Sequence, residues 1–230
     1  MTGRWIVWRA FWLVCRGNEF VRMWKIFCYG HWQKVASLQL SSFIMYWNQT
    51  SVELFHFLFY FIFLIGFSGS SQKLVFFAWE AVWGKVLILD QLQRWGWSLT
   101  NRCFLCLRHE ESIDHLLLHC EMTWVLWELI FVLFRVSWVL SSSVKDTLLG
   151  WNGSFIGKKW REVWQAIPLC LFWMVWKTRN NIAFCNEIFS IQKLKREFVC
   201  FLWSEAKLFV DECPLTLVEF FEWLGTGWIC

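Results

Sequence analysis

Four residues with the chemistry of metal ligands are gathered between positions 103 and 120. They follow the spacing Cys-x2-Cys-x8-His-x4-Cys and are Cys103, Cys106, His115 and Cys120. Thiolate sulfur and imidazole nitrogen are donors that Zn²⁺ prefers, and a Cys-x2-Cys turn lets two sulfurs reach one ion from adjacent backbone. A set of four leaves no open coordination position. The spacing therefore predicts a structural zinc site, not a catalytic one.

Two further histidines lie in the same stretch. His119 comes four residues after His115, on the same side of a helix, and is the rival ligand. His109 is a weaker rival because it is close to Cys106. The alternatives to a metal site are a redox Cys-x2-Cys motif and chance clustering in a chain with 10 cysteines. We favour zinc because two more ligands stand at usable spacing and no βαβ pattern surrounds the motif.

No group of residues with a catalytic pattern is evident elsewhere. A polymerase holds two metal ions with paired carboxylates, whereas the sequence contains no Asp-Asp pair. Glu110 and Glu111 are expected to begin a solvated helix that Ser112 caps. Residues 153–159 resemble a phosphate-binding loop only faintly, because the glycines are one residue too close and no Ser or Thr follows the lysine. We expect no enzymatic activity.

The composition is unusually apolar and aromatic. Hydrophobic residues make up 57% and charged residues 17%, and the 21 Trp and 24 Phe must fill a core, face lipid or sit exposed. A degenerate or mis-assembled reading frame that no selection for solubility has shaped would also give this composition. The formal net charge of +4 permits contact with nucleic acid, although no dense basic block occurs. No clean signal peptide and no disulfide framework are present, so we expect an intracellular protein, nuclear or cytoplasmic.

The order of apolar and polar residues predicts a mainly α protein, a small helical zinc-binding domain with flanking helices. Gly84 is expected to stop the first helix, and Pro168 to break or kink the fifth. The helices are expected at 73–84, 86–94, 122–136, 145–149, 160–184 and 190–210.

Three regions follow from this pattern, with a polar break at 68–72 as the first boundary. Residues 1–70 are an aromatic-rich segment of uncertain structure, 71–136 the zinc-binding domain, and 137–230 a helical C-terminal region. The run 54–67 carries no formal charge. Because a membrane span needs about 20 apolar residues, we favour a buried element there. The alternative is a small membrane protein anchored by this run.

The stretch around the four ligands resembles a known protein family. Residues 110–120 read Glu-Glu-Ser-Ile-Asp-His-Leu-Leu-Leu-His-Cys, and Trp124 or Trp127 follows. Together with the Cys-x2-Cys pair, this is similar to the zinc-binding domain found C-terminal to the reverse transcriptase of plant non-LTR (LINE-type) retrotransposons. Two flanking segments resemble parts of the same family: Lys73-Leu-Val-Phe76-Phe77-Ala-Trp79 and Trp173-x2-Trp176-Lys177-x-Arg179-Asn180.

The resemblance covers roughly residues 73–185 and has no counterpart in the first 70. It implies a retrotransposon-derived protein, with a reverse transcriptase or another retroelement protein as a candidate partner. The alternative is a non-functional retroelement remnant. It also implies the ligand set Cys103, Cys106, His115 and Cys120 for a structural Zn²⁺.

Basic and aromatic residues surround the cysteine-histidine stretch. Arginines there could contact phosphates while tryptophan rings stack on unpaired bases, which predicts RNA or single-stranded DNA as a partner. The alternative is that the tryptophans are core residues and the arginines are merely solvated. The candidate residues are Arg94, Trp95, Trp97, Arg102 and Arg108.

Overall fold

The computed structural model describes residues 69–151, 158–185, 188–208, 210 and 213–225. All of them belong to one compact unit, Val52–Cys230. The aromatic run at 54–67 and most of the glycine-lysine loop at 153–159 lie outside the described residues. The described part is helical and contains no strand, which confirms the predicted mainly α class. Its elements are α5 (Gly69–Val82), α6 (Leu89–Arg94), the π turn η3 (His115–His119), α7 (Glu121–Leu133), α8 (Val144–Gly150), α9 (Lys158–Cys185), α10 (Ile191–Ala206) and α11 (Leu217–Gly225).

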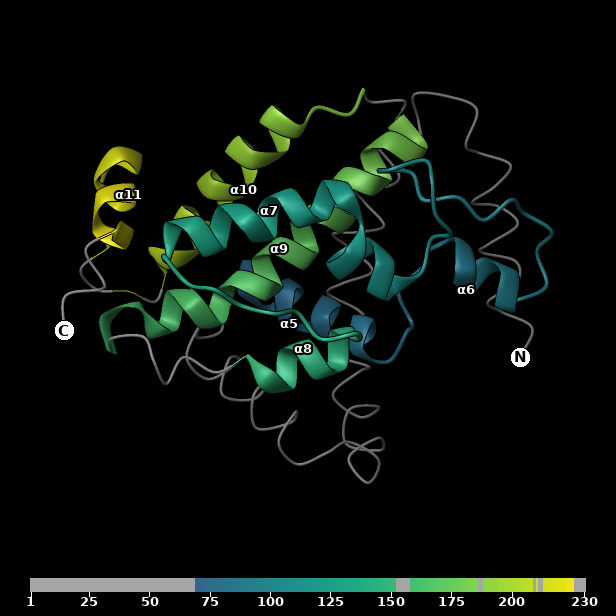
Figure 1. Ribbon diagram of the computed structural model, residues 1–230, viewed down its shortest axis with the longest axis horizontal. Coiled ribbons are helices and arrows are strands. Elements are labelled where there is room, and N and C mark those ends of the chain that lie inside the picture. The colour runs from purple at the N-terminus through teal and green to yellow at the C-terminus, as the bar shows by residue number, and fades with distance from the viewer. Residues whose placement is uncertain (1–68, 152–157, 186–187, 209, 211–212, 226–230) are drawn as a thin grey trace. The chain divides into compact units, whose positions relative to one another are not determined.

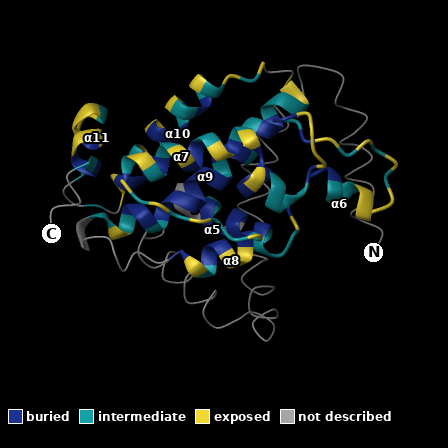
Figure 2. Cartoon of the chain, viewed as in Figure 1, coloured by how far each residue is buried: buried dark blue, intermediate teal, exposed yellow. Residues whose placement is uncertain are grey.

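The long helix α9 lies at the centre of this unit and packs against α5, α10 and η3 (Figure 1). Leu171 and Val175, four residues apart, have no exposed surface and belong to one apolar stripe. Figure 2 shows this burial along α5 and α9, in contrast to the more exposed α6 and α11. The helix continues through Pro168, so the expected break is wrong. Burial of residues 163–172 on several sides of the helix offsets a proline cost of about 3 kcal/mol.

The first described helix, α5, starts earlier than expected and ends where expected. It begins at Gly69, so residues 69–72 are helical and do not form a polar break. Gly84 ends it with a φ of +57°, a conformation that costs glycine little. The Gly84 N–H donates to the Ala81 carbonyl at 3.0 Å, and the Lys85 N–H to the Glu80 carbonyl at 2.8 Å. These two bonds satisfy the last carbonyls of the helix.

Helices α8 and α10 begin at serine caps. The Oγ atom of Ser143 accepts from the Asp146 N–H at 3.1 Å, and that of Ser190 from the Lys193 N–H at 3.4 Å. The predicted helices at 122–136, 145–149 and 190–210 therefore exist with slightly different ends. Helix α11 was not predicted, and it packs on α7 and α10 with Phe220 fully buried.

Tryptophan rings form part of the core of the described unit. Trp151 and Trp164 stack with centroids 4.4 Å apart and planes at 9°, and the Trp151 Nε1–H donates to the Trp164 carbonyl at 2.8 Å. Trp127 joins them at 5.4 Å from Trp151. None of the described helices combines the length and the apolar composition that a membrane crossing requires.

Candidate metal centre

The structure brings four potential ligand atoms to one point. One atom each from Cys103, Cys106, His115 and Cys120 lies within 4.8 Å of the other three. Cys103 and Cys120 have no exposed surface, and Cys106 is 9% exposed. His115 is half-buried, so the group lies at the edge of the core and is partly shielded from water.

A tight turn presents the first two cysteines. The Leu107 N–H donates to the Cys103 carbonyl at 2.9 Å, and the Cys103 N–H donates to the His109 carbonyl at 2.8 Å. Leu107 closes the turn with a φ of +55°, which is unusual for a leucine. These bonds fold residues 103–109 back on themselves, so the two sulfurs face the same side.

A π turn presents the other two ligands. Ser112 caps its start, as predicted, because its Oγ atom accepts from the His115 N–H at 3.1 Å. The Cys120 N–H then donates to the His115 carbonyl at 2.6 Å, a bond between residues five apart. In an α-helix, residues five apart point about 140° away from each other. The wider π turn brings Cys120 round towards the side of His115.

Side chains of α7 hold this π turn in place. The Thr123 hydroxyl donates to the Leu116 carbonyl at 2.7 Å, and the Trp127 Nε1–H donates to the Leu117 carbonyl at 3.0 Å. Both donors are fully buried. Of the two tryptophans noted after the last cysteine, Trp127 therefore supports the site, whereas Trp124 is 38% exposed. Carbonyls that the turn cannot pair internally are satisfied in this way.

The spacing of the ligand atoms fits one tetrahedral zinc ion. The Cys103 and Cys120 sulfurs are 3.9 Å apart, and the Cys106 sulfur is 3.4 Å from His115 Nε2. Zinc bonds of about 2.3 Å to sulfur and about 2.0 Å to nitrogen give tetrahedron edges of about 3.8 Å and about 3.6 Å. A disulfide would require about 2.05 Å between sulfurs, so the Cys103–Cys120 pair is not one.

The same atoms share protons through hydrogen bonds. The pKa of Cys120 is lowered, chiefly because of its hydrogen bond with the Cys103 sulfur and also because the Met122 and Thr123 N–H groups face it. That hydrogen bond, aided by burial, raises the pKa of Cys103 to about 12. Hydrogen bonding with Cys103 likewise raises the pKa of His115. Binding of a cation by the thiolates is therefore coupled to proton release.

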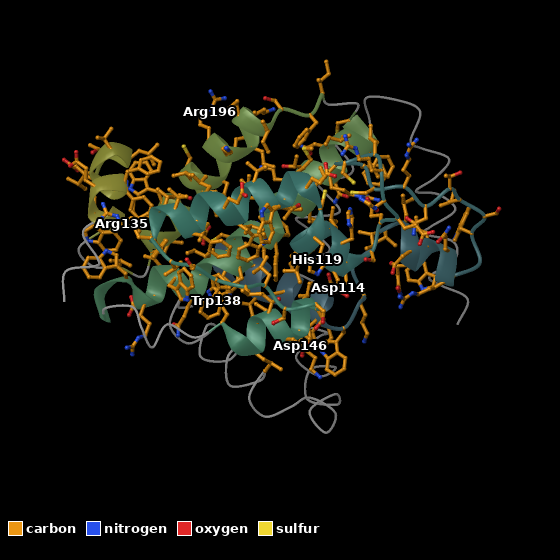
Figure 3. The ribbon with its side chains drawn as sticks, in the orientation of Figure 1. Asp114, His119, Arg135, Trp138, Asp146 and Arg196 are labelled. Carbon is orange, nitrogen blue, oxygen red and sulfur yellow. The ribbon has the colours of Figure 1, made fainter. Side chains whose placement is uncertain are left out.

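Neither of the two rival histidines belongs to this cluster. His119 Nε2 is 3.2 Å from the Ser142 carbonyl, and Asp114 beside the same turn accepts from the Val144 N–H at 2.7 Å, so both reach towards the start of α8 (Figure 3). His109 is exposed, with its ring 5.4 Å from that of His115. The geometry thus favours His115 over both.

Comparison with known proteins supports the same stretch. Residues 61–127 match the family model described as zinc-binding in reverse transcriptase. The match contains all four members of the cluster and ends at Trp127. No curated protein and no solved structure matches the chain. The stretch that holds the four candidate ligands is therefore similar to the zinc-binding region of reverse transcriptases.

Glu111 departs from the prediction of a solvated helix start, because it is completely buried. Its carboxylate pairs with Arg179 of α9, and the Arg179 Nη2 to Glu111 Oε1 distance is 2.6 Å. No local pattern indicates this pair, because its members are 68 residues apart in the chain. The one available signal was the position of Arg179. It lies four residues after Val175 on an apolar stripe, which indicates a buried arginine that needs a partner.

The residues predicted to bind nucleic acid lie on the surface near the cysteine turn. Arg94 pairs with Asp90 at 3.1 Å on α6, and Arg108 pairs with Glu121 at 3.0 Å. Arg102 is exposed beside Cys103. Trp95 is 43% exposed, which leaves part of its ring accessible, whereas Trp97 is half-buried.

Proposed function

We propose that this chain is a retrotransposon-derived zinc protein of the plant non-LTR (LINE-type) class. Cys103, Cys106, His115 and Cys120 bind one structural Zn²⁺, and the chain has no polymerase activity of its own. The observation that carries the proposal is the convergence of these four ligand atoms within 4.8 Å, inside the residues that match the family model. Three sulfurs and one imidazole nitrogen suit zinc, and four protein ligands leave no position for a substrate or a reactive water.

The role that this geometry supports is to fix the helices on either side of the site. The cysteine turn follows α6, and Cys120 stands between η3 and α7. One ion bound by both segments holds α6 and α7 in a fixed relation. Because such a site does not exist in the unfolded chain, the free energy of metal binding contributes to folding.

Zinc content of the purified full chain tests the proposal. We expect one zinc per wild-type chain, loss of that zinc in Cys106→Ser, and lower cooperativity of unfolding in the same variant. Cys200→Ser is the matched control, because Cys200 is an exposed cysteine on α10. Equal zinc content in wild type and Cys106→Ser would contradict the ligand assignment.

Contact with single-stranded RNA or DNA is the second part of the proposal. The accessible ring of Trp95 and the exposed arginines beside the metal centre support it. The ion pairs of Arg94 and Arg108 are exposed, so phosphate can compete with their carboxylate partners. A reverse transcriptase or another retroelement protein is the proposed protein partner.

Salt-dependent binding of single-stranded RNA tests this contact. Replacing Arg94, Arg102 and Arg108 with Ala should weaken binding and reduce the slope of log K against log salt by about 0.7 for each lost phosphate contact. Trp95→Ala should cost about 1–3 kcal/mol if a base stacks on the ring. The control is Arg196→Ala on α10 (Figure 3). An unchanged affinity and slope in the triple variant would refute nucleic-acid contact at this surface.

A further inference from the structure

A buried ion pair lies beside the metal centre and joins it to α9. Arg179 Nε is 3.2 Å and 3.1 Å from the two carboxylate oxygens of Glu111, and Arg179 Nη2 is 2.6 Å from Oε1. The two side chains are 3% and 0% exposed. A pair without access to water depends on complete hydrogen bonding, because either charge left alone would be costly.

The Glu111 carboxylate also binds the backbone of the cysteine turn and of α6. Its Oε2 accepts from the Phe104 N–H at 3.3 Å, and its Oε1 accepts from the Leu89 N–H at 3.1 Å. Phe104 stands between Cys103 and Cys106. Glu111 therefore ties the cysteine turn to the first residue of α6 as well as to α9.

The position of Glu111 in the chain extends this link to the remaining ligands. It immediately precedes Ser112, which caps the turn that carries His115. Its own N–H donates to Asn101 Oδ1 at 2.8 Å, and Asn101 lies just before the cysteine turn. The relative placement of the cysteine turn and the π turn thus depends on the conformation of Glu111.

Arg179 holds Glu111 in that conformation. Its remaining nitrogen, Nη1, donates to Asn180 Oδ1 at 3.0 Å. Its guanidinium lies over the Phe104 ring at 4.7 Å and over the Phe184 ring at 5.8 Å. Two aromatic rings and an amide therefore hold the guanidinium group in place. The guanidinium presents two N–H groups to one carboxylate.

We propose that Arg179 is a positioning residue for the metal centre, acting through Glu111 on the cysteine turn. This inference rests on the proposed zinc site and extends it. Arg179 lies outside residues 61–127, so the metal-binding unit of this chain includes α9 beyond the family match. The function of the Arg179-Asn180 segment is then to order the ligands, not to contact a substrate.

Zinc affinity of the full chain, measured by competition with a chromophoric chelator, tests the inference. Arg179→Met keeps the length of the side chain and removes its charge and donors. Changes to residues that support metal ligands typically weaken binding by about 10- to 100-fold, and we expect a loss in that range. The Co²⁺ absorption spectrum of the variant should also change, because the sulfur ligands lose their fixed geometry. Arg179→Lys retains the positive charge but not the paired N–H donors of the guanidinium. It should show a smaller loss of zinc affinity and an altered Co²⁺ spectrum.

Lys177→Ala is the matched control, because Lys177 is exposed on the same helix two residues away. It should leave zinc affinity and the Co²⁺ spectrum unchanged. A lower unfolding temperature in Arg179→Met, with zinc affinity and spectrum equal to wild type, would overturn the inference and reduce the pair to a structural role. If Arg179→Met fails to fold, the zinc affinity and the Co²⁺ spectrum of Arg179→Lys test the inference in its place. Absence of zinc from the wild-type chain would instead refute the proposed function itself.

Discussion

Glu80 on α5 should make the stability of this protein depend on pH. The side chain is largely buried, and desolvation raises its pKa from 4.5 to about 7, although the positive charge of Lys85 acts in the opposite direction. Between these two values the folded protein keeps the proton that the unfolded chain releases. Stability is therefore fully present below pH 4.5 and is lost as the pH rises through about 7.

The magnitude follows from the difference between the two pKa values. At about 1.4 kcal/mol per pKa unit, a rise from 4.5 to about 7 corresponds to at most about 3 kcal/mol above pH 7. Glu80→Gln keeps the shape of the side chain and removes the titration. The variant should match wild type near pH 4.5 and exceed it by up to about 3 kcal/mol at pH 8.

Urea unfolding of zinc-saturated protein at several pH values measures this difference. Because each comparison is made at one pH, protonation of the metal ligands affects both proteins equally. Glu222→Gln, an exposed position on α11, is the control and should change the unfolding free energy by less than about 0.5 kcal/mol at each pH. A difference between Glu80→Gln and wild type that stays constant from pH 5 to pH 8 would refute the reasoning.

Three further changes should alter stability by amounts that denaturant or thermal unfolding can measure. Arg135 follows α7 with a φ of 48°, so Arg135→Gly should stabilise the protein by about 1 kcal/mol, whereas Arg135→Ala should not. Trp164→Ala removes a fully buried ring and should cost about 3–5 kcal/mol, against less than about 0.5 kcal/mol for Val132→Ala at a 73% exposed position. Ser143→Ala removes the cap of α8 and should cost about 1 kcal/mol, and an unchanged midpoint would show that the cap is not needed.

Local patterns in the sequence were sufficient to predict most helices of the described part. Caps such as Ser143 and stops such as Gly84 act within four residues, so their effect can be inferred without the fold. Pro168 shows where such inference fails. A proline opposes a helix locally, but the packing of α9 on several sides at that point stabilises the unbroken helix, and this packing depends on residues far away in the sequence.

In the metal centre, too, some features follow from local sequence and others depend on the folded structure. Ligand types and the Cys-x2-Cys spacing are local, so a four-residue set could be named from them. The sequence left His119 as a rival of His115, because residues four apart share one face of an α-helix. The actual turn closes between His115 and Cys120, and it directs His119 to the Ser142 carbonyl instead. Spacing rules for an α-helix do not apply to a π turn.

The proposed role of Arg179 would explain how a helix later in the chain than the four candidate ligands contributes to the metal centre. Two short turns and one ion fix the ligands only if the turns cannot move relative to each other. The Glu111 carboxylate ties the cysteine turn to the start of α6, and Glu111 directly precedes Ser112, which caps the π turn. A buried carboxylate needs a cation that is itself held in place. Arg179 on the central helix meets that need, since α9 packs against α5, α10 and η3. On this proposal, the core of the described helices holds the metal centre in place.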